Sequence, residues 1–166
     1  MTVVKRRIDL LAIIISAISL VGIYGCSTQK RASDFLIKAK IDSLIAIPKI
    51  EFKPTQATPI SYRSVNLSYG YYLRISKDSV SCYLPYYGRA YTANLNSSEA
   101  GINFTSTNFG YQKDAAPKGS YTIRIEPKDT RQKFKLYLSI QESGYASLQV
   151  TDPERQSISF YGAIDY

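Results

Sequence analysis

Hydrophobic and polar residues alternate along most of the chain after residue 47, which is the pattern of β-strands that bury one face. The alternation is most regular in the last third, where it predicts strands around 121–125, 134–140, 146–150 and 158–162. Only short turns separate these four segments. Because parallel strands need long crossover connections, short turns favour antiparallel hairpins.

The middle of the chain shows the same period less regularly. Strands are predicted at 50–52, 65–69, 71–75, 79–84, 89–93 and 101–104, whereas 54–59, 94–100 and 115–119 are expected to be loops. We therefore expect an all-β protein, either an antiparallel β-sandwich or a strongly curved sheet of about eight to ten strands. A closed, lipocalin-like barrel is the alternative.

The first 46 residues follow a different pattern. Basic residues 5–7 precede an apolar run, so residues 1–25 are predicted to be a signal peptide. Residues 26–46 are expected to form a tether and a short helix over 32–46 that Pro48 ends, and 47–166 to form the all-β domain. The alternative for the apolar run is an uncleaved membrane anchor, because Ile8 to Gly25 spans 18 residues. Both interpretations put the rest of the chain outside the cytoplasm.

The composition narrows the possible chemistry. The chain has no His and no Trp, which removes the commonest general base and metal ligand and leaves no expected metal or cofactor. The formal charge is +8; without the charged residues of the leader (three basic and one acidic) it is +6. A moderately basic surface suits anionic headgroups or acidic glycans, while nucleic acid is a poor partner for an exported chain.

The candidate binding site is a tyrosine-rich stretch, residues 82–91. Cys82 is expected to point inward on a strand that Pro85 ends. The residues that follow could form a platform for a sugar ring or peptide, with a guanidinium at its rim. The candidate residues are Tyr86, Tyr87, Arg89 and Tyr91. The alternative is that these tyrosines are half-buried wall residues of a small β-protein.

Three segments of the chain resemble a known family. They are Tyr83-Leu84-Pro85-Tyr86-Tyr87-Gly88-Arg89-Ala90-Tyr91, Gly101-Ile102-Asn103-Phe104 and Arg155-Gln156-Ser157-Ile158-Ser159-Phe160-Tyr161-Gly162. With them, residues 47–164 resemble the Bacteroidetes lipoprotein family known as domain of unknown function 4251. The resemblance implies a secreted, lipid-anchored all-β domain, and it implies no activity and no catalytic residues.

Two kinds of covalent modification are also suggested by resemblance. Ile23-Tyr24-Gly25-Cys26 resembles a bacterial lipobox, in which Cys26 would carry the lipid. Ser43 and Ser79 each follow an aspartate and precede an apolar residue, which resembles the O-glycosylation acceptor of Bacteroidetes. The tether lacks the acidic residues of surface-exported Bacteroidetes lipoproteins, so we expect the periplasmic face of the outer membrane.

These observations support a functional hypothesis with two alternatives. The first is a non-catalytic, lipid-anchored module of the cell envelope that binds a glycan, a peptide or a protein. The alternatives are a structural envelope protein without a small ligand and a hydrolase that uses carboxylates. The oligomeric state and the ligand do not follow from the sequence.

Overall fold

The computed structural model describes residues 26–91 and 101–166, except for the side chains of residues 26–32 and of Lys118. Two compact units divide the chain, residues 1–36 and residues 37–166. The second unit contains every strand of the described residues. The predicted signal peptide, residues 1–25, lies outside the described residues and stays a prediction.

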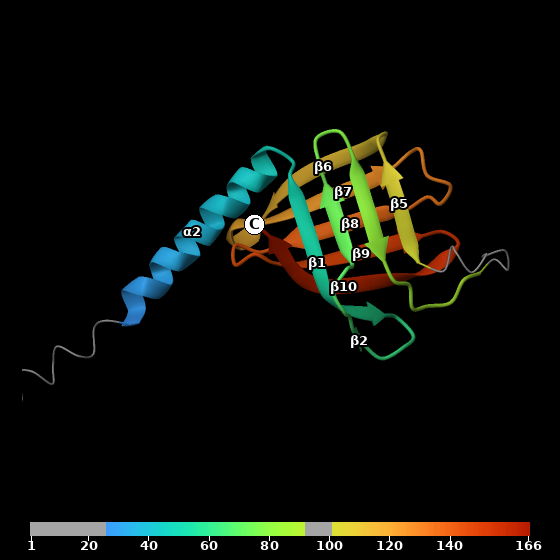
Figure 1. Ribbon diagram of the computed structural model, residues 1–166, viewed down its shortest axis with the longest axis horizontal. Helices are drawn as coiled ribbons and strands as arrows, with labels where there is room; N and C mark the ends of the chain where they lie inside the picture. The colour runs from blue at the N-terminus through green and yellow to red at the C-terminus, as the bar shows by residue number, and fades with distance from the viewer. Residues whose placement is uncertain (1–25, 92–100) are drawn as a thin grey trace, which may run out of the picture. The chain divides into compact units, whose positions relative to one another are not determined.

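Ten antiparallel strands form one sheet. In chain order they are β1 (Ile50–Pro59), β2 (Val65–Asn66), β3 (Tyr72–Ile75), β4 (Val80–Leu84), β5 (Ile102–Ser106), β6 (Phe109–Ala116), β7 (Ser120–Pro127), β8 (Lys135–Ile140), β9 (Tyr145–Asp152) and β10 (Arg155–Asp165). Across the sheet the order is β5-β4-β3-β1-β10-β9-β8-β7-β6, and β2 pairs with β1 beside this path. The edge strands β5 and β6 are joined by only two residues, and the sheet curls into a nearly closed barrel (Figure 1). The predicted all-β curved sheet, with the barrel as its alternative, is confirmed.

The barrel interior is filled by side chains that alternate along each strand. In β8, for example, Leu136, Leu138 and Ile140 are fully buried, while the residues between them face outward. The four strands predicted in the last third correspond to β7, β8, β9 and β10. Cys82 is 1% exposed on the inner face of β4, as predicted, and burial raises the pKa of its thiol.

The end of helix α2 (Cys26–Ala46) closes one end of the barrel. Ile41 and Ile45, one turn apart on the same helix face, are buried in the same core as the strand residues. Next to Ile41, Asp42 accepts a hydrogen bond of 2.9 Å from the hydroxyl of Tyr121 on β7. The helix ends two residues before Pro48, as predicted, and its backbone begins at Cys26, earlier than the predicted residue 32.

The predicted loop at 54–59 is wrong, because this segment continues β1 to Pro59. The strand tolerates Pro54 because its pairing changes there. Residues 50–52 pair with β3, residues 56–57 pair with β2, and the register with β10 shifts between Pro54 and Gln56. Proline lacks an N–H and is accepted in a sheet at such a bulge. The composition of the segment favoured a loop, and the strands on both sides outweigh that local preference.

A carboxylate joins the two edge strands to the rest of the barrel. Asp129, in the β7–β8 loop, accepts hydrogen bonds from the hydroxyl of Ser106 and from the backbone N–H of Thr107 (2.9 Å) and Asn108 (3.1 Å). These residues form the corner between β5 and β6. The hydrogen bond from Ser106, followed by that from Thr107, lowers the pKa of Asp129 to about 2. The corner therefore depends on the charge of Asp129.

We expect Asp129→Asn to remove a stabilising contribution that depends on pH. The pKa of this carboxyl is lower in the folded protein than its ordinary value of 3.8, so its contribution is complete above about pH 5 and is lost as the pH falls toward 2. The free energy of unfolding, measured by urea denaturation, should differ most between wild type and variant at pH 5 to 7 and converge near pH 2. Ser106→Ala should weaken the same dependence. Parallel curves for wild type and Asp129→Asn would contradict this role.

Candidate functional site

The outer face of β1, β3 and β4 carries a continuous row of polar and aromatic side chains. Glu51 on β1 is directly opposite Arg74 on β3, and Tyr72 on β3 is opposite Tyr83 on β4. Residues that are paired across antiparallel strands lie close enough for their side chains to interact. The fold thus brings together residues from 51 to 83 on one surface.

Four tyrosines gather at one end of this row. The rings of Tyr71 and Tyr83 stack, with centroids 5.6 Å apart, and the ring of Tyr72 lies 6.1 Å from that of Tyr83. Tyr69 belongs to the preceding turn and its side chain is fully exposed. Gly70 makes this turn possible, because its φ of 111° is strained for any residue with a Cβ.

Three of these tyrosines, Tyr69, Tyr71 and Tyr72, line a surface groove of about 500 Å³, which we call the tyrosine groove. It is lined by Glu51, Lys53, Pro54, Thr55, Leu67, Ser68, Tyr69, Gly70, Tyr71, Tyr72 and Arg74. Its volume lies within the range of sites for small ligands. Aromatic faces and charged groups are combined in the lining, which suits a ligand that has both apolar and polar surfaces.

The charged groups of the groove are held by ion pairs. Both oxygens of Glu51 contact the guanidinium of Arg74, at 3.1 Å each, and this guanidinium lies 4.1 Å from the centre of the Tyr72 ring. Lys53 donates a hydrogen bond to Asp165 on β10. These hydrogen bonds raise the pKa of Arg74 and of Lys53. The pairs are solvent-exposed, so they orient the side chains more than they stabilise the fold.

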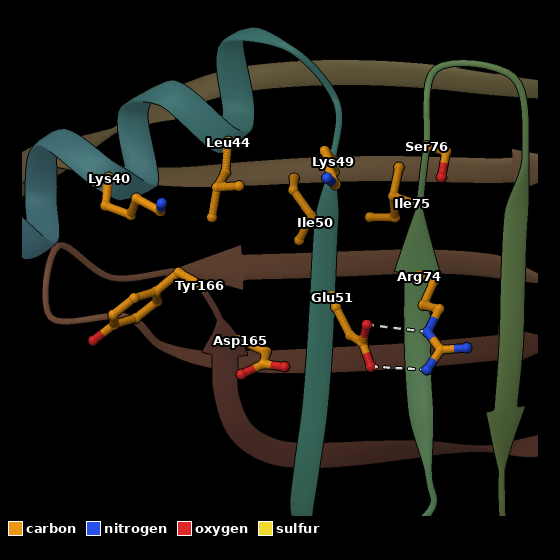
Figure 2. A pocket seen from close by; sticks show the side chains of 10 residues that line it. All are labelled: Lys40, Leu44, Lys49, Ile50, Glu51, Arg74, Ile75, Ser76, Asp165 and Tyr166. Carbon is orange, nitrogen blue, oxygen red and sulfur yellow. Dashed lines mark hydrogen bonds and ion pairs between the residues drawn. The ribbon is translucent and has the colours of Figure 1, made fainter.

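A second cleft, of about 410 Å³, adjoins the groove across the Glu51–Arg74 pair, and we call it the lysine cleft. It is lined by Lys40, Leu44, Lys49, Ile50, Glu51, Arg74, Ile75, Ser76, Asp165 and Tyr166. Figure 2 shows Lys40 and Leu44 reaching from α2, and Glu51 and Arg74 facing each other between β1 and β3. The two clefts share Glu51 and Arg74, so together they form one extended surface.

Comparison with known proteins places the chain in a family. Residues 36–164 match the family described as "Domain of unknown function (DUF4251)". The chain belongs to this family. The crystal structure of a DUF4251 family protein from Bacteroides eggerthii DSM 20697 is similar, with a TM-score of 0.59 and 6% sequence identity over 80% of this chain and 89% of that one. At this identity the likeness shows the fold alone. A comparison with curated proteins gave no match.

In this DUF4251 domain, Tyr86 of the predicted site is half-buried and bound to the backbone. Its hydroxyl lies 3.0 Å from the carbonyl oxygens of both Arg89 and Gln156. The guanidinium of Arg155 lies 5.3 Å from the centre of its ring. Desolvation by these surroundings raises the pKa of Tyr86. These contacts fix the stretch after Pro85 against the start of β10.

The other predicted binding residues are more accessible. Arg89 is exposed, Tyr91 is 66% exposed, and Tyr87 is half-buried against the core. The backbone N–H of Tyr91 donates a hydrogen bond of 2.8 Å to the backbone carbonyl of Glu154. The structure therefore brings Tyr86, Tyr87, Arg89 and Tyr91 to one short segment beside the β9–β10 turn. None of the four lines the tyrosine groove or the lysine cleft. Their role in binding stays a prediction.

The predicted modification sites lie on α2 and beside β4. The lipobox residues 23–25 lie outside the described residues; Cys26 begins α2, and its side chain is not described. Ser43 is exposed on α2 and donates a 2.7 Å hydrogen bond to the carbonyl of Lys40. Ser79 belongs to the β3–β4 turn, where its carbonyl accepts from Ser76 at 2.8 Å. Both glycosylation sites and the lipid site stay predictions.

The sequence pattern did not single out the tyrosine groove. Its one signal is the segment Tyr69-Gly70-Tyr71-Tyr72, followed two residues later by Arg74. We interpreted this segment only as part of two strands. Tyr83 on the next strand and Glu51 on β1 adjoin this segment only through strand pairing, so no local signal marks their contribution.

The described residues contain no group of three or more His, Cys, Asp or Glu side chains that could hold a metal ion. Among residues 26–91 and 101–166, no helix has both the length and the apolar character needed to cross a membrane. The expectations about metals and about a membrane anchor are not tested by these two findings.

Proposed function

We propose that this DUF4251 protein is a non-catalytic binding module of the cell envelope that holds a glycan in the tyrosine groove. The observation that carries the proposal is the fully exposed ring of Tyr69 beside the stacked pair of Tyr71 and Tyr83, at the edge of a groove of about 500 Å³. Large exposed aromatic side chains that border a concave surface are typical of binding sites.

A glycan suits both parts of this surface. The apolar C–H faces of a sugar ring pack on tyrosine rings, while sugar hydroxyls need hydrogen-bond donors and acceptors around them. Arg74 and Lys53 offer N–H donors in the groove, and Glu51 offers carboxylate oxygens. A peptide or a protein segment is the second candidate, since it also combines apolar and polar surfaces.

The charges around the groove support binding more than catalysis. A carboxylate that acts as a general acid or as a nucleophile needs access to the substrate and a suitable pKa. Glu51 is engaged by Arg74 through both oxygens, and Asp165 accepts a hydrogen bond from Lys53. The sequence contains no His that could act in their place. A hydrolase would be revealed by new reducing ends after incubation with oligosaccharides.

The location that we propose follows from the sequence before the barrel. A lipid on Cys26 would anchor the module to the periplasmic face of the outer membrane. We expect radiolabelled palmitate to enter the wild-type protein in growing cells and to be absent from Cys26→Ser. Cys82→Ser is the matched control and should be labelled like the wild type, because Cys82 is buried inside the barrel. Equal labelling of the wild type and of Cys26→Ser would contradict a lipid anchor.

The glycan proposal is tested by removing the exposed ring. We expect Tyr69→Ser to weaken binding to the best ligand of an array of neutral and uronic-acid oligosaccharides by roughly tenfold, the loss of one stacking surface. The affinity is measured by titration calorimetry. Stability should change by no more than about 0.5 kcal/mol, because the side chain is fully exposed.

The controls separate the groove from other exposed tyrosines. Tyr62→Ser removes a 56% exposed ring that lies outside the groove and should leave binding unchanged. Arg89→Ala tests the site predicted from sequence. A loss of binding in Arg89→Ala, with Tyr69→Ser unaffected, would move the site to residues 86–91. Wild-type protein that binds no oligosaccharide of the array would refute the glycan proposal and leave a peptide, a protein or a structural role.

A further inference from the structure

The lysine cleft holds positive charge that the fold does not neutralise. Its two side-chain carboxylates are engaged, Glu51 by Arg74 and Asp165 by Lys53. Lys40, on α2, and Lys49, just before β1, have no ion-pair partner among the described residues. Two uncompensated ammonium groups in one concavity create a local potential that attracts an anion.

The lining of the cleft adds a floor and further polar groups. Leu44 forms its accessible apolar part, with the almost fully buried Ile50 and Ile75 behind it, and the hydroxyl groups belong to Ser76 and Tyr166. A bound anion could therefore interact with ammonium groups while the carbon skeleton that carries it packs on Leu44. This arrangement differs from a flat array of surface lysines, because charged and apolar groups line the same hollow (Figure 2).

The position of the cleft indicates what kind of anion it would bind. It shares Glu51 and Arg74 with the tyrosine groove, so one extended molecule could occupy both. Arg74 is oriented by Glu51 and by the Tyr72 ring, and it lies between the aromatic and the cationic parts. A chain of sugars that carries carboxylates would place one ring on the tyrosines and a charged neighbour beside the lysines.

We propose that the lysine cleft is an anion subsite, and that the ligand of this protein is an acidic glycan whose carboxylates bind Lys40 and Lys49. The inference rests on the proposed function, because it assigns the charge of the glycan that the tyrosine groove holds. It adds the chemical class of the ligand and the two lysines that would bind it. A phospholipid headgroup is the competing source of negative charge, and it is distinguished by experiment.

The test uses matched probes that share one sugar skeleton and differ in whether the carboxyl group is ionised or esterified. Oligomers of galacturonate and of alginate are compared with their methyl esters, which keep the sugar skeleton and lose the carboxylate charge. Wild-type protein should bind an acid more tightly than its ester, and salt should weaken only the binding of the acid. In Lys40→Ser/Lys49→Ser the acid should bind about fivefold to tenfold more weakly, as expected for two exposed ion pairs, and the ester should bind as before.

The control is a double variant that removes two lysines elsewhere on the surface and so changes the net charge by the same amount. Lys113→Ser/Lys133→Ser removes two exposed lysines that do not line either cleft, and it should leave the preference for the acid intact. An equal loss in both double variants would assign the effect to net charge and overturn the subsite.

The remaining outcomes separate this inference from the proposed function. If acids and esters bind equally and Tyr69→Ser weakens both, the glycan site stands and the anion subsite is refuted. If neither acids nor esters bind, both proposals fail. Vesicles of phosphatidylglycerol and of phosphatidylcholine form the last arm. Binding to phosphatidylglycerol that depends on Lys40 and Lys49, without preference among the sugars, would assign the cleft to a membrane surface and overturn the acidic glycan.

Discussion

Gly162→Ala should destabilise the protein by about 3 kcal/mol or more, because a methyl group has no space at this position. A Cβ on Gly162 would lie 2.0 Å from the carbonyl oxygen of Lys53 and 2.7 Å from the Cα of Pro54. Both contacts are with backbone atoms, so relief requires β1 and β10 to separate. These strands meet here at the bulge that lets β1 carry Pro54 in the middle of the sheet. The free energy of unfolding in urea measures the effect.

Gly110→Ala is the matched control for this substitution. Gly110 also lies in a strand, β6, but a Cβ there would meet only the side chain and carbonyl of Glu126, at 3.8 and 3.9 Å. Alanine fits without strain, so stability should change by no more than about 1 kcal/mol. If Gly162→Ala and Gly110→Ala lose similar stability, the close approach of β1 to Gly162 is not the cause of the loss.

Arg155→Met should destabilise the protein by roughly 3 kcal/mol or more, because it leaves a negative charge buried without its partner. The side chains of Arg155 and Asp152 are 2% and 4% exposed, with Nε and Oδ2 3.6 Å apart. Arg155 also donates to the carbonyl of Gly101 at 3.1 Å and lies against the ring of Tyr86. It thereby connects β10 with the start of β5 and with the tyrosine-rich stretch. Chemical denaturation gives the loss.

A double variant separates the buried charge from the lost packing. Asp152→Asn/Arg155→Met removes both charges, while the amide oxygen at position 152 can still accept the 3.0 Å hydrogen bond from the N–H of Glu154. We expect it to be more stable than Arg155→Met by about 1 kcal/mol or more. If the double variant is no more stable than the single one, packing around Arg155 outweighs the charge pair.

The same contacts bear on the binding site that the sequence pattern suggested. Tyr86 is held by Arg155 and by backbone carbonyls, so its removal would disturb the barrel as well as any ligand. Tyr69 has no such role, since its ring is fully exposed. Binding measurements on Tyr69 variants can therefore be interpreted without a correction for stability, which makes the tyrosine groove the better place to begin.

The local pattern of the sequence was sufficient for the strands whose burial alternates. β7 to β10 and β4 were predicted because their apolar residues have period two and proline or short turns end them. The inward position of Cys82 followed from the same pattern. Pro48 was sufficient to end α2, because proline cannot continue a helix. In these elements the local preference and the tertiary structure agree.

One strand and the second half of another could not be recognised from local pattern. The segment 54–59 contains two prolines, and its strand conformation depends on neighbours on both sides. β6 is an edge strand that pairs only with β7, and none of its residues is fully buried, so no alternation marks it. Its register is set by backbone hydrogen bonds to β7, and these bonds do not depend on a particular sequence in β6.

The sequence by itself determined the fold class and which face of each regular strand is buried, because both follow from the period of its hydrophobic residues. It also determined that the chain is rich in tyrosine, lysine and arginine. Only the tertiary structure decided where those side chains meet. Strand pairing brings Glu51 to Arg74 and Tyr72 to Tyr83, and the end of α2 brings Lys40 to the start of β1. A local pattern can predict a strand or a turn, but which side chains lie opposite each other depends on the register and order of the strands and on how the end of α2 packs on the barrel.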